Sequence, residues 1–325
     1  MKLFRRLAAA AAAAGVAYGA ASYFLARRLA ARLVSPTGLG PAPDRADSLR
    51  DALEKHAAVV EEIRHDGSSR LPAELAAVFA SPGEPSSRPT ILFLHGKGGA
   101  ASEWEPDALR ALRLGWNVLL PDLRGHGRSE GELFTLGLLE REDLELLIAE
   151  ARTRFGIAPE RVAIHACSAG SSVALQFAAD RAELRAAWLE SPFGQSREMA
   201  QHYLSRATRI PAPLLWLATE LAVRRAVARI RRDLGAPRGD GGIERIDPVA
   251  AAFRLRCPVA LVYGAEDRLV PARFTERLAA ALPPGSVVWR VDNAGHCHHD
   301  DEPQKRAGDD YVKRWEEFFK RHLES

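Results

Sequence analysis

The sequence predicts an α/β fold with a mostly parallel central sheet. From residue 90 onward, short runs of β-branched and aliphatic residues alternate with amphipathic segments of helical length. Strands that are apolar along their whole length are typical of a parallel sheet covered by helices on both faces. A second observation concerns Ser168, which follows a strand-like run and precedes a helix-like one, with the small residues Ala166 and Gly170 on either side. This pattern indicates a sharp strand-to-helix turn that exposes one hydroxyl group.

The composition narrows the class of protein. A length of 325 residues allows one large α/β domain with an insertion, or two modest domains. The net charge of +3 is too small to indicate nucleic acid as a partner, and the chain has no nucleic-acid-binding motif. The three cysteines are too few for a disulfide framework, so we expect Cys167, Cys257 and Cys297 to be small buried residues. The oligomeric state is left open.

Residues 1–34 form the first predicted segment, a membrane anchor or signal segment. Residues 7–26 carry no charge, and basic residues flank them on both sides: Lys2, Arg5, Arg6, Arg27, Arg28 and Arg32. Twenty helical residues cover about 30 Å, enough to cross a bilayer. Because eleven of the twenty are alanine, the segment is only marginally apolar. An uncleaved anchor is favoured, while a signal peptide cleaved near Ala21 and an alanine-rich soluble helix stay open.

The charges around this segment say little about its orientation. Three basic residues precede it and three follow it, so the positive-inside rule gives nearly equal weight to both orientations. The free amino terminus weakly favours the cytoplasmic side for the start of the chain. We therefore expect a membrane-anchored protein whose catalytic domain lies outside the cytoplasm.

Residues 35–89 are predicted to hold a linker and the first elements of the sheet. Residues 35–43 are rich in proline and glycine and cannot continue a helix. A short helix is expected over about 46–62 and a strand over 74–80. Residues 81–89 are expected to form a surface loop.

Residues 90–325 are predicted to form the main catalytic domain. Its strands are expected at 90–94, 117–120, 162–165, 186–189, 259–263 and 287–291. Helices are expected between and after them, at 140–154, 169–179, 273–281 and 310–323.

More than sixty residues separate the strand that ends near Glu190 from the strand that begins near Pro258. This insertion, about 192–250, is mainly helical in pattern, with Pro211 and Pro213 opening a helix and a glycine-rich loop at its end. We interpret it as a cap that covers the active site. Its second helix passes from an apolar half to an arginine-rich half, which indicates a solvated face or, alternatively, contact with anionic headgroups or an acidic substrate.

Ser168 has the partners that a serine nucleophile needs. A serine hydroxyl attacks only when a base takes its proton and an acid orients that base. Asp267 follows the predicted strand 259–263, and His296 follows the strand 287–291. We predict Ser168 as nucleophile, Asp267 as orienting acid and His296 as general base. Cys167 does not fit as the nucleophile, because His165 would then occupy a position that requires a small residue.

Other polar residues near these strand ends are weaker candidates. Glu190 ends the strand before the cap and is the alternative acid, although capping or ion pairing is the favoured role. Near His296 lie His298, His299, Asp300 and Asp301, but no second ligand cluster stands at metal spacing elsewhere. We expect exposed loop residues there, and no metal or cofactor.

The reaction also needs N–H donors for the negative charge on the attacked oxygen. The backbone N–H of Ala169, directly after the nucleophile, is one candidate, and the N–H of Lys97 in the loop 95–99 is the other. His95, which precedes the glycines of that loop, is expected to orient it.

Together these residues resemble the α/β-hydrolase superfamily. The resemblance extends from about residue 90 to the C-terminus. It rests on the loop 95–99, the turn 122–129, the Ser168 turn, the segment 264–271 and Gly295-His296. Within the superfamily the chain is similar to the serine-aminopeptidase or acylaminoacyl-peptidase-like branch, which includes membrane-anchored bacterial members. Two features depart from the common pattern: Ala166 replaces a glycine, and the lipase-type His-Gly-Gly-Gly loop is absent.

The predicted function is a serine hydrolase that cleaves a carboxylic ester or related acyl bond of a small-molecule substrate. A peptidase that trims short peptides is an alternative, although the arginine-rich cap offers no obvious acidic anchor for a free amino terminus. A third possibility is a scaffold that binds a partner through the cap and has no activity. The intact set Ser168, Asp267 and His296 argues against this last interpretation.

Overall fold

The computed structural model describes the chain except for residues 38–44, 180, 195, 236–245 and 325. The chain divides into two compact units. The helical unit comprises Met1–Ser35 and Arg197–Asp240, and the sheet unit comprises Pro36–Ser196 and Gly241–Ser325. Most of the predicted linker 35–43 and most of the glycine-rich loop after residue 235 lie outside the described residues.

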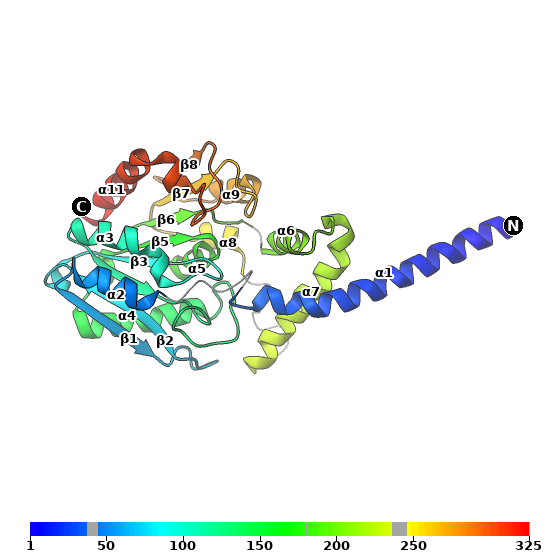
Figure 1. Ribbon diagram of the computed structural model, residues 1–325, viewed down its shortest axis with the longest axis horizontal. Helices are drawn as coiled ribbons and strands as arrows, with labels where there is room; N and C mark the ends of the chain where they lie inside the picture. Colours follow the sequence, from blue (N-terminus) through cyan, green and yellow to red (C-terminus); the bar gives the residue numbers. More distant parts are fainter. Residues whose placement is uncertain (38–44, 180, 195, 236–245, 325) are drawn as a thin grey trace. The chain divides into compact units, whose positions relative to one another are not determined.

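The sheet unit is built on eight strands in the order β1-β2-β4-β3-β5-β6-β7-β8 (Figure 1). They are β1 (Val59–His65), β2 (Leu75–Ser81), β3 (Thr90–Leu94), β4 (Asn117–Pro121), β5 (Val162–Cys167), β6 (Ala187–Glu190), β7 (Val259–Gly264) and β8 (Val287–Val291). β1 pairs with β2 and β2 with β4 in antiparallel fashion, and every later pair is parallel. The predicted mostly parallel sheet is confirmed.

One predicted element is wrong. The helix expected over 46–62 ends early, as α2 (Ala46–Glu54), and β1 begins at Val59. The run from Val59 to His65 pairs residue by residue with β2, from Val59 opposite Ser81 to His65 opposite Leu75. β-branched residues favour a strand once such a neighbour exists. The long-range partner therefore decided the structure of this segment.

Helices cover the sheet on both faces, as the apolar strands indicate. They are α3 (Glu105–Arg113), α4 (Glu140–Phe155), α5 (Ser168–Ala178), α8 (Pro248–Ala252), α9 (Ala272–Ala279), α10 (Pro303–Ala307) and α11 (Asp309–Leu323). Buried side chains of α2, α3 and α11 share one core cluster with Ile91 and Phe93 of β3. Side chains alternate along a strand, so Leu92 and Leu94 face the opposite side, where α5 packs against β3 and β5.

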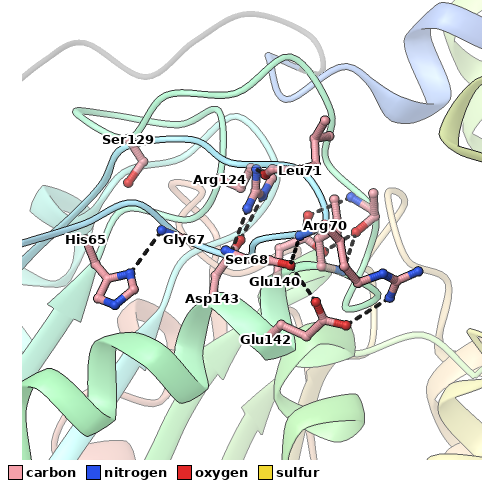
Figure 2. Close-up of polar contacts among 12 residues, drawn as sticks. His65, Gly67, Ser68, Arg70, Leu71, Arg124, Ser129, Glu140, Glu142 and Asp143 are labelled. Carbon is pink, nitrogen blue, oxygen red and sulfur yellow. Dashed lines mark hydrogen bonds and ion pairs between the residues drawn. The ribbon is translucent and has the colours of Figure 1, made fainter. Parts of the chain in front are cut away.

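A buried ion pair fixes the turn that follows β4. Arg124 is only 1% exposed, and its Nε and Nη2 donate to the carboxylate of Asp143 in α4 at 2.8 and 2.6 Å. Its Nη1 donates to the carbonyl of Leu71 at 2.6 Å, while the N–H of Ser68 donates to Asp143 at 2.9 Å (Figure 2). This fork-shaped contact ties three distant segments together.

The helical unit consists of α1 (Lys2–Val34), α6 (Ser196–Thr208) and α7 (Ala212–Asp233). Its core joins the three helices through Ala26, Leu29, Leu204, Leu215, Ala218 and Ala222. Pro211 and Pro213 stand at the start of α7, as predicted. α1 is long and apolar enough to cross a membrane, by length and composition.

Candidate active site

The candidate nucleophile lies at the junction of β5 and α5 in the sheet unit. Ser168 is the first residue of α5 and has φ +49°, in the left-handed region that non-glycine residues rarely adopt. Backbone strain of this kind is frequent at functional sites and is expected of a nucleophile turn. The predicted sharp turn is therefore present in the backbone.

Small residues are required around this turn for a specific reason. A Cβ on Gly170 would overlap the carbonyl oxygens of Leu94 and His95, because α5 begins directly against the end of β3. Ala166, on the other side, is fully buried and pairs with Leu94 in the sheet. Its methyl group fits there, so alanine in place of the usual glycine leaves the turn intact.

Asp267 and His296 meet in a direct hydrogen bond. Asp267 follows β7, and its Oδ1 accepts hydrogen bonds from the N–H groups of Leu269 and Val270 at 2.9 and 2.8 Å. Its Oδ2 lies 2.7 Å from Nδ1 of His296. A carboxylate accepts, so Nδ1 carries the proton, and in the neutral imidazole the lone pair then lies on Nε2. This tautomer is the one a general base requires.

The electrostatics of His296 follow from its surroundings. The imidazole is 6% exposed, and this burial acts to lower its pKa by disfavouring the charged form. Hydrogen bonding to Asp267 and contact with Cys297 act in the opposite direction, and the pKa of His296 is raised above its usual value of 6.5. Cys297 and the Asp267 carboxylate thus both favour the imidazolium that proton transfer would create.

The loop after β3 lies against the candidate nucleophile. A Cβ placed on Gly96 would stand 3.3 Å from the Cβ of Ser168. Lys97 lies in a turn closed by a hydrogen bond from the N–H of Gly99 to the carbonyl of Gly96, at 3.1 Å. Burial lowers the pKa of the Lys97 side chain to about 8. Ala169 is 5% exposed at the start of α5, where helix N–H groups point outward from the first turn.

His95 orients this loop, as the sequence indicates. It is fully buried, and its Nδ1 lies 2.7 Å from the carbonyl of Gly96. Its Nε2 accepts the N–H of Leu123 at 2.9 Å, which joins the loop after β3 to the turn after β4. Burial lowers the pKa of His95 to about 4, so the ring stays neutral and Nε2 remains an acceptor at neutral pH.

Glu190, the alternative acid, has different partners. At the end of β6, it accepts a hydrogen bond from the Tyr311 hydroxyl and lies 2.8 Å from Nε2 of His165. Trp315 Nε1 donates to Nδ1 of His165 at 3.1 Å, and Trp188 Nε1 to the Tyr311 hydroxyl at 3.0 Å. His165 and Tyr311 thus contact Glu190 directly in the core, and the two tryptophans contact those partners. Sequence reasoning missed this network, because its members are spread over three distant segments.

The residues after His296 are less exposed than expected. His298 is half-buried, its ring centroid 4.6 Å from that of Trp104, and its N–H donates to Glu302 at 2.6 Å. The expectation of exposure is therefore wrong for His298 and for Asp301, which is also half-buried, and right for His299 and Asp300. In the part of the chain that the structure describes, no three His, Cys, Asp or Glu side chains group closely enough to hold a metal ion. The three cysteines are buried and free.

Comparison with known proteins decides the family. The model of the alpha/beta hydrolase family matches residues 91–308, about two thirds of the chain. The chain belongs to the α/β-hydrolase family. Among its relatives is RutD from Enterobacter cloacae, which its name describes provisionally as a carbamate hydrolase. It is 30% identical over 250 residues, 69% of this chain and 90% of RutD. The relative YqkD from Bacillus subtilis, named as uncharacterized, is 27% identical over 194 residues, and the alignment spans 57% of each protein.

The fold of this hydrolase is similar to that of solved members. The esterase Pf2001 from Pyrococcus furiosus superimposes with a TM-score of 0.63 at 18% sequence identity, over 83% of this chain and 95% of the esterase. The predicted resemblance to the superfamily is thus confirmed. Its assignment to a particular branch stays a prediction, as do the roles of the site residues.

Proposed function

We propose that this hydrolase cleaves a carboxylic ester or related acyl bond with Ser168 as nucleophile. The Ser168 Oγ attacks the acyl carbon while His296 Nε2 takes the hydroxyl proton, and the backbone N–H groups of Lys97 and Ala169 stabilise the oxyanion. When the intermediate collapses, His296 returns the proton to the leaving alcohol. Water then attacks the acyl-enzyme with His296 again as base, which releases the acid and restores Ser168.

The observation that carries this proposal is the 2.7 Å contact between Asp267 Oδ2 and His296 Nδ1. Two backbone N–H groups hold the second oxygen of Asp267, so the carboxylate has one orientation. Such a buried and fixed carboxylate has the features of an acid that orients a catalytic histidine. The left-handed Ser168 supports the same assignment, because that conformation is costly and typical of a nucleophile turn.

We further propose that α1 anchors the protein in a membrane, with the amino terminus on the cytoplasmic side. Support comes from the length and apolar composition of α1 and from the basic residues at both of its ends. A reporter fused to the C-terminus, active on only one side of the membrane, tests the orientation. Activity of a cytoplasm-specific reporter would contradict it.

A fluorophosphonate probe, which reacts with activated serines, is expected to label the wild-type protein and to leave Ser168→Ala unlabelled. Cys167→Ala provides the matched control in the same turn, because its thiol is buried and takes no part in the proposed chemistry. It should label as the wild type does. Equal labelling of wild type and Ser168→Ala would remove Ser168 from the mechanism. A panel of p-nitrophenyl esters and aminoacyl-p-nitroanilides then separates esterase from peptidase activity.

The pH dependence of ester hydrolysis is expected to report His296. A general base must be neutral, so kcat/KM falls as the pH falls through the pKa of His296 in the folded protein. That pKa is raised, so the midpoint of the acid limb should lie above 6.5. A wild-type midpoint below 6.5 would contradict the assignment.

A further inference from the structure

The helical unit contains a groove between α1 and α7 that is lined by arginines. Four of its eight lining residues are Arg27, Arg225, Arg229 and Arg232, and the other four are alanines. We call it the arginine groove. Small alanine side chains leave room between the two helices, and the guanidinium groups surround that room. A narrow space bordered by several guanidiniums suits an anion with several oxygens, because each guanidinium can donate two parallel hydrogen bonds.

The described ion pairs of the arginine groove involve the carboxylate of Asp233. Asp233 lies 3.5 Å from Arg229 and 3.4 Å from Arg232, so one carboxylate faces two of the four guanidiniums. Arg225 instead lies over the ring of Tyr23, 4.6 Å from its centroid. Stacking of this kind holds the guanidinium in place without neutralising it. Four guanidiniums around one narrow space thus attract a phosphate to the groove.

The position of the arginine groove along the two helices identifies the source of that phosphate. Arg27 follows directly on the uncharged stretch 7–26 of α1. Both helices expose large apolar side chains before their arginines: Val16 and Phe24 of α1 are 74% and 65% exposed, and Leu214 and Trp216 of α7 are 60% and 59% exposed.

These apolar ends are physically joined. The Tyr18 hydroxyl donates to the carbonyl of Leu214 at 3.1 Å, and α7 crosses α1 from there toward the arginines (Figure 1). Arg27 and Arg225 come nine residues, about 13 Å, after Tyr18 and Trp216 along their helices. Arg27 ends the uncharged stretch, which is the level where lipid phosphates lie.

We propose that the arginine groove binds the phosphate of an anionic phospholipid, at the end of the membrane span proposed for α1. The proposal uses the membrane anchoring proposed for α1 but not the hydrolytic mechanism. Of the two interpretations of the arginine-rich half of α7, contact with anionic headgroups is thus favoured over a solvated face. A lipid rather than a free phosphate is the ligand, because exposed apolar surface on both helices continues from the groove.

The test is calorimetric titration of the full chain, held in neutral detergent, with short-chain phosphatidylglycerol. Arg27→Gln/Arg225→Gln removes one groove arginine from each helix. Arg28→Gln/Arg224→Gln is the matched control, because it removes the adjacent arginine of each helix, outside the groove, with the same change of charge. We expect the groove variant to bind phosphatidylglycerol at least about tenfold more weakly, as loss of two charge-assisted contacts implies, and the control variant to stay within about threefold.

Two further arms separate the alternatives. Short-chain phosphatidylcholine, which has no net charge, should bind the wild-type protein much more weakly than phosphatidylglycerol does. Inorganic phosphate should also bind the wild-type protein much more weakly than phosphatidylglycerol does. An equal loss of affinity for phosphatidylglycerol in the two variants would show diffuse electrostatic attraction and would overturn the proposal that the lipid binds in the arginine groove. Binding of inorganic phosphate as tight as that of the lipid would overturn the lipid as ligand. Hydrolytic activity does not enter any of these outcomes, so they stand apart from the role of Ser168.

Discussion

Asp267→Asn is expected to lower kcat for ester hydrolysis by about 10⁴-fold, the loss typical when an orienting aspartate becomes an amide. The Asp267 carboxylate accepts from His296 Nδ1 at 2.7 Å and so selects the tautomer with a free Nε2. An asparagine amide turned toward His296 would donate instead, which would place the proton on Nε2 and leave no base. Steady-state kinetics on a p-nitrophenyl ester measures the change.

Glu190→Gln is the control for this assignment. Its carboxylate contacts His165 and Tyr311, so its replacement should change kcat by less than about tenfold, apart from any loss of folded protein. Thermal unfolding of both variants separates a folding defect from a catalytic one. If Glu190→Gln lost as much kcat as Asp267→Asn while remaining folded, the identification of Asp267 as the acid would be wrong.

Arg124→Met is expected to lower the free energy of unfolding by about 3–5 kcal/mol, because it leaves the buried Asp143 carboxylate without its cation. Asp143 would retain the N–H of Ser68, which is too little for a buried charge. The methionine fills much of the volume, so the effect is chiefly electrostatic. Denaturant-induced unfolding of the full chain in detergent, followed by near-UV circular dichroism, reports it.

The neighbouring pair in Figure 2 supplies the comparison. Arg70 contacts Glu142 at 2.9 Å, but its side chain is 40% exposed. Arg70→Met should therefore cost less than about 1 kcal/mol. Arg124→Met/Asp143→Leu, which removes both buried charges, should recover much of the loss. A single Arg124→Met variant as stable as Arg70→Met would show that Asp143 finds another partner or a proton at little cost.

The sequence predicted the parallel part of the sheet well, because strands such as β3 and β7 are apolar along their whole length and need no partner to be recognised. The sequence also predicted that Asp267 and His296 follow two strands of the sheet, and the structure joins them by a hydrogen bond. Their catalytic roles, and that of Ser168, stay predictions for the experiments above.

Features that depend on contacts between residues far apart in the chain could not be predicted from the sequence. Residues 59–62 have a pattern compatible with a helix, and only pairing with β2 makes them a strand. Arg124 and Asp143 stand nineteen residues apart with no local pattern that couples them, and the His165–Glu190 contact is hidden inside two apolar strands. The interpretation of residues 192–250 as a cap over the active site stays a prediction, while α6 and α7 within it share a core with α1.

The left-handed backbone of Ser168 has a consequence for how this protein can evolve. For a residue with a Cβ, that conformation costs about 1–2 kcal/mol relative to the ordinary right-handed one. The surrounding contacts must supply that energy, from the pairing of β5 with β3 to the close seating of Gly170 beneath the loop after β3. Lineages that lost the chemistry would be free to relax the turn, and they would gain stability by doing so. Holding the serine in this conformation is what the nucleophilic role proposed for Ser168 requires.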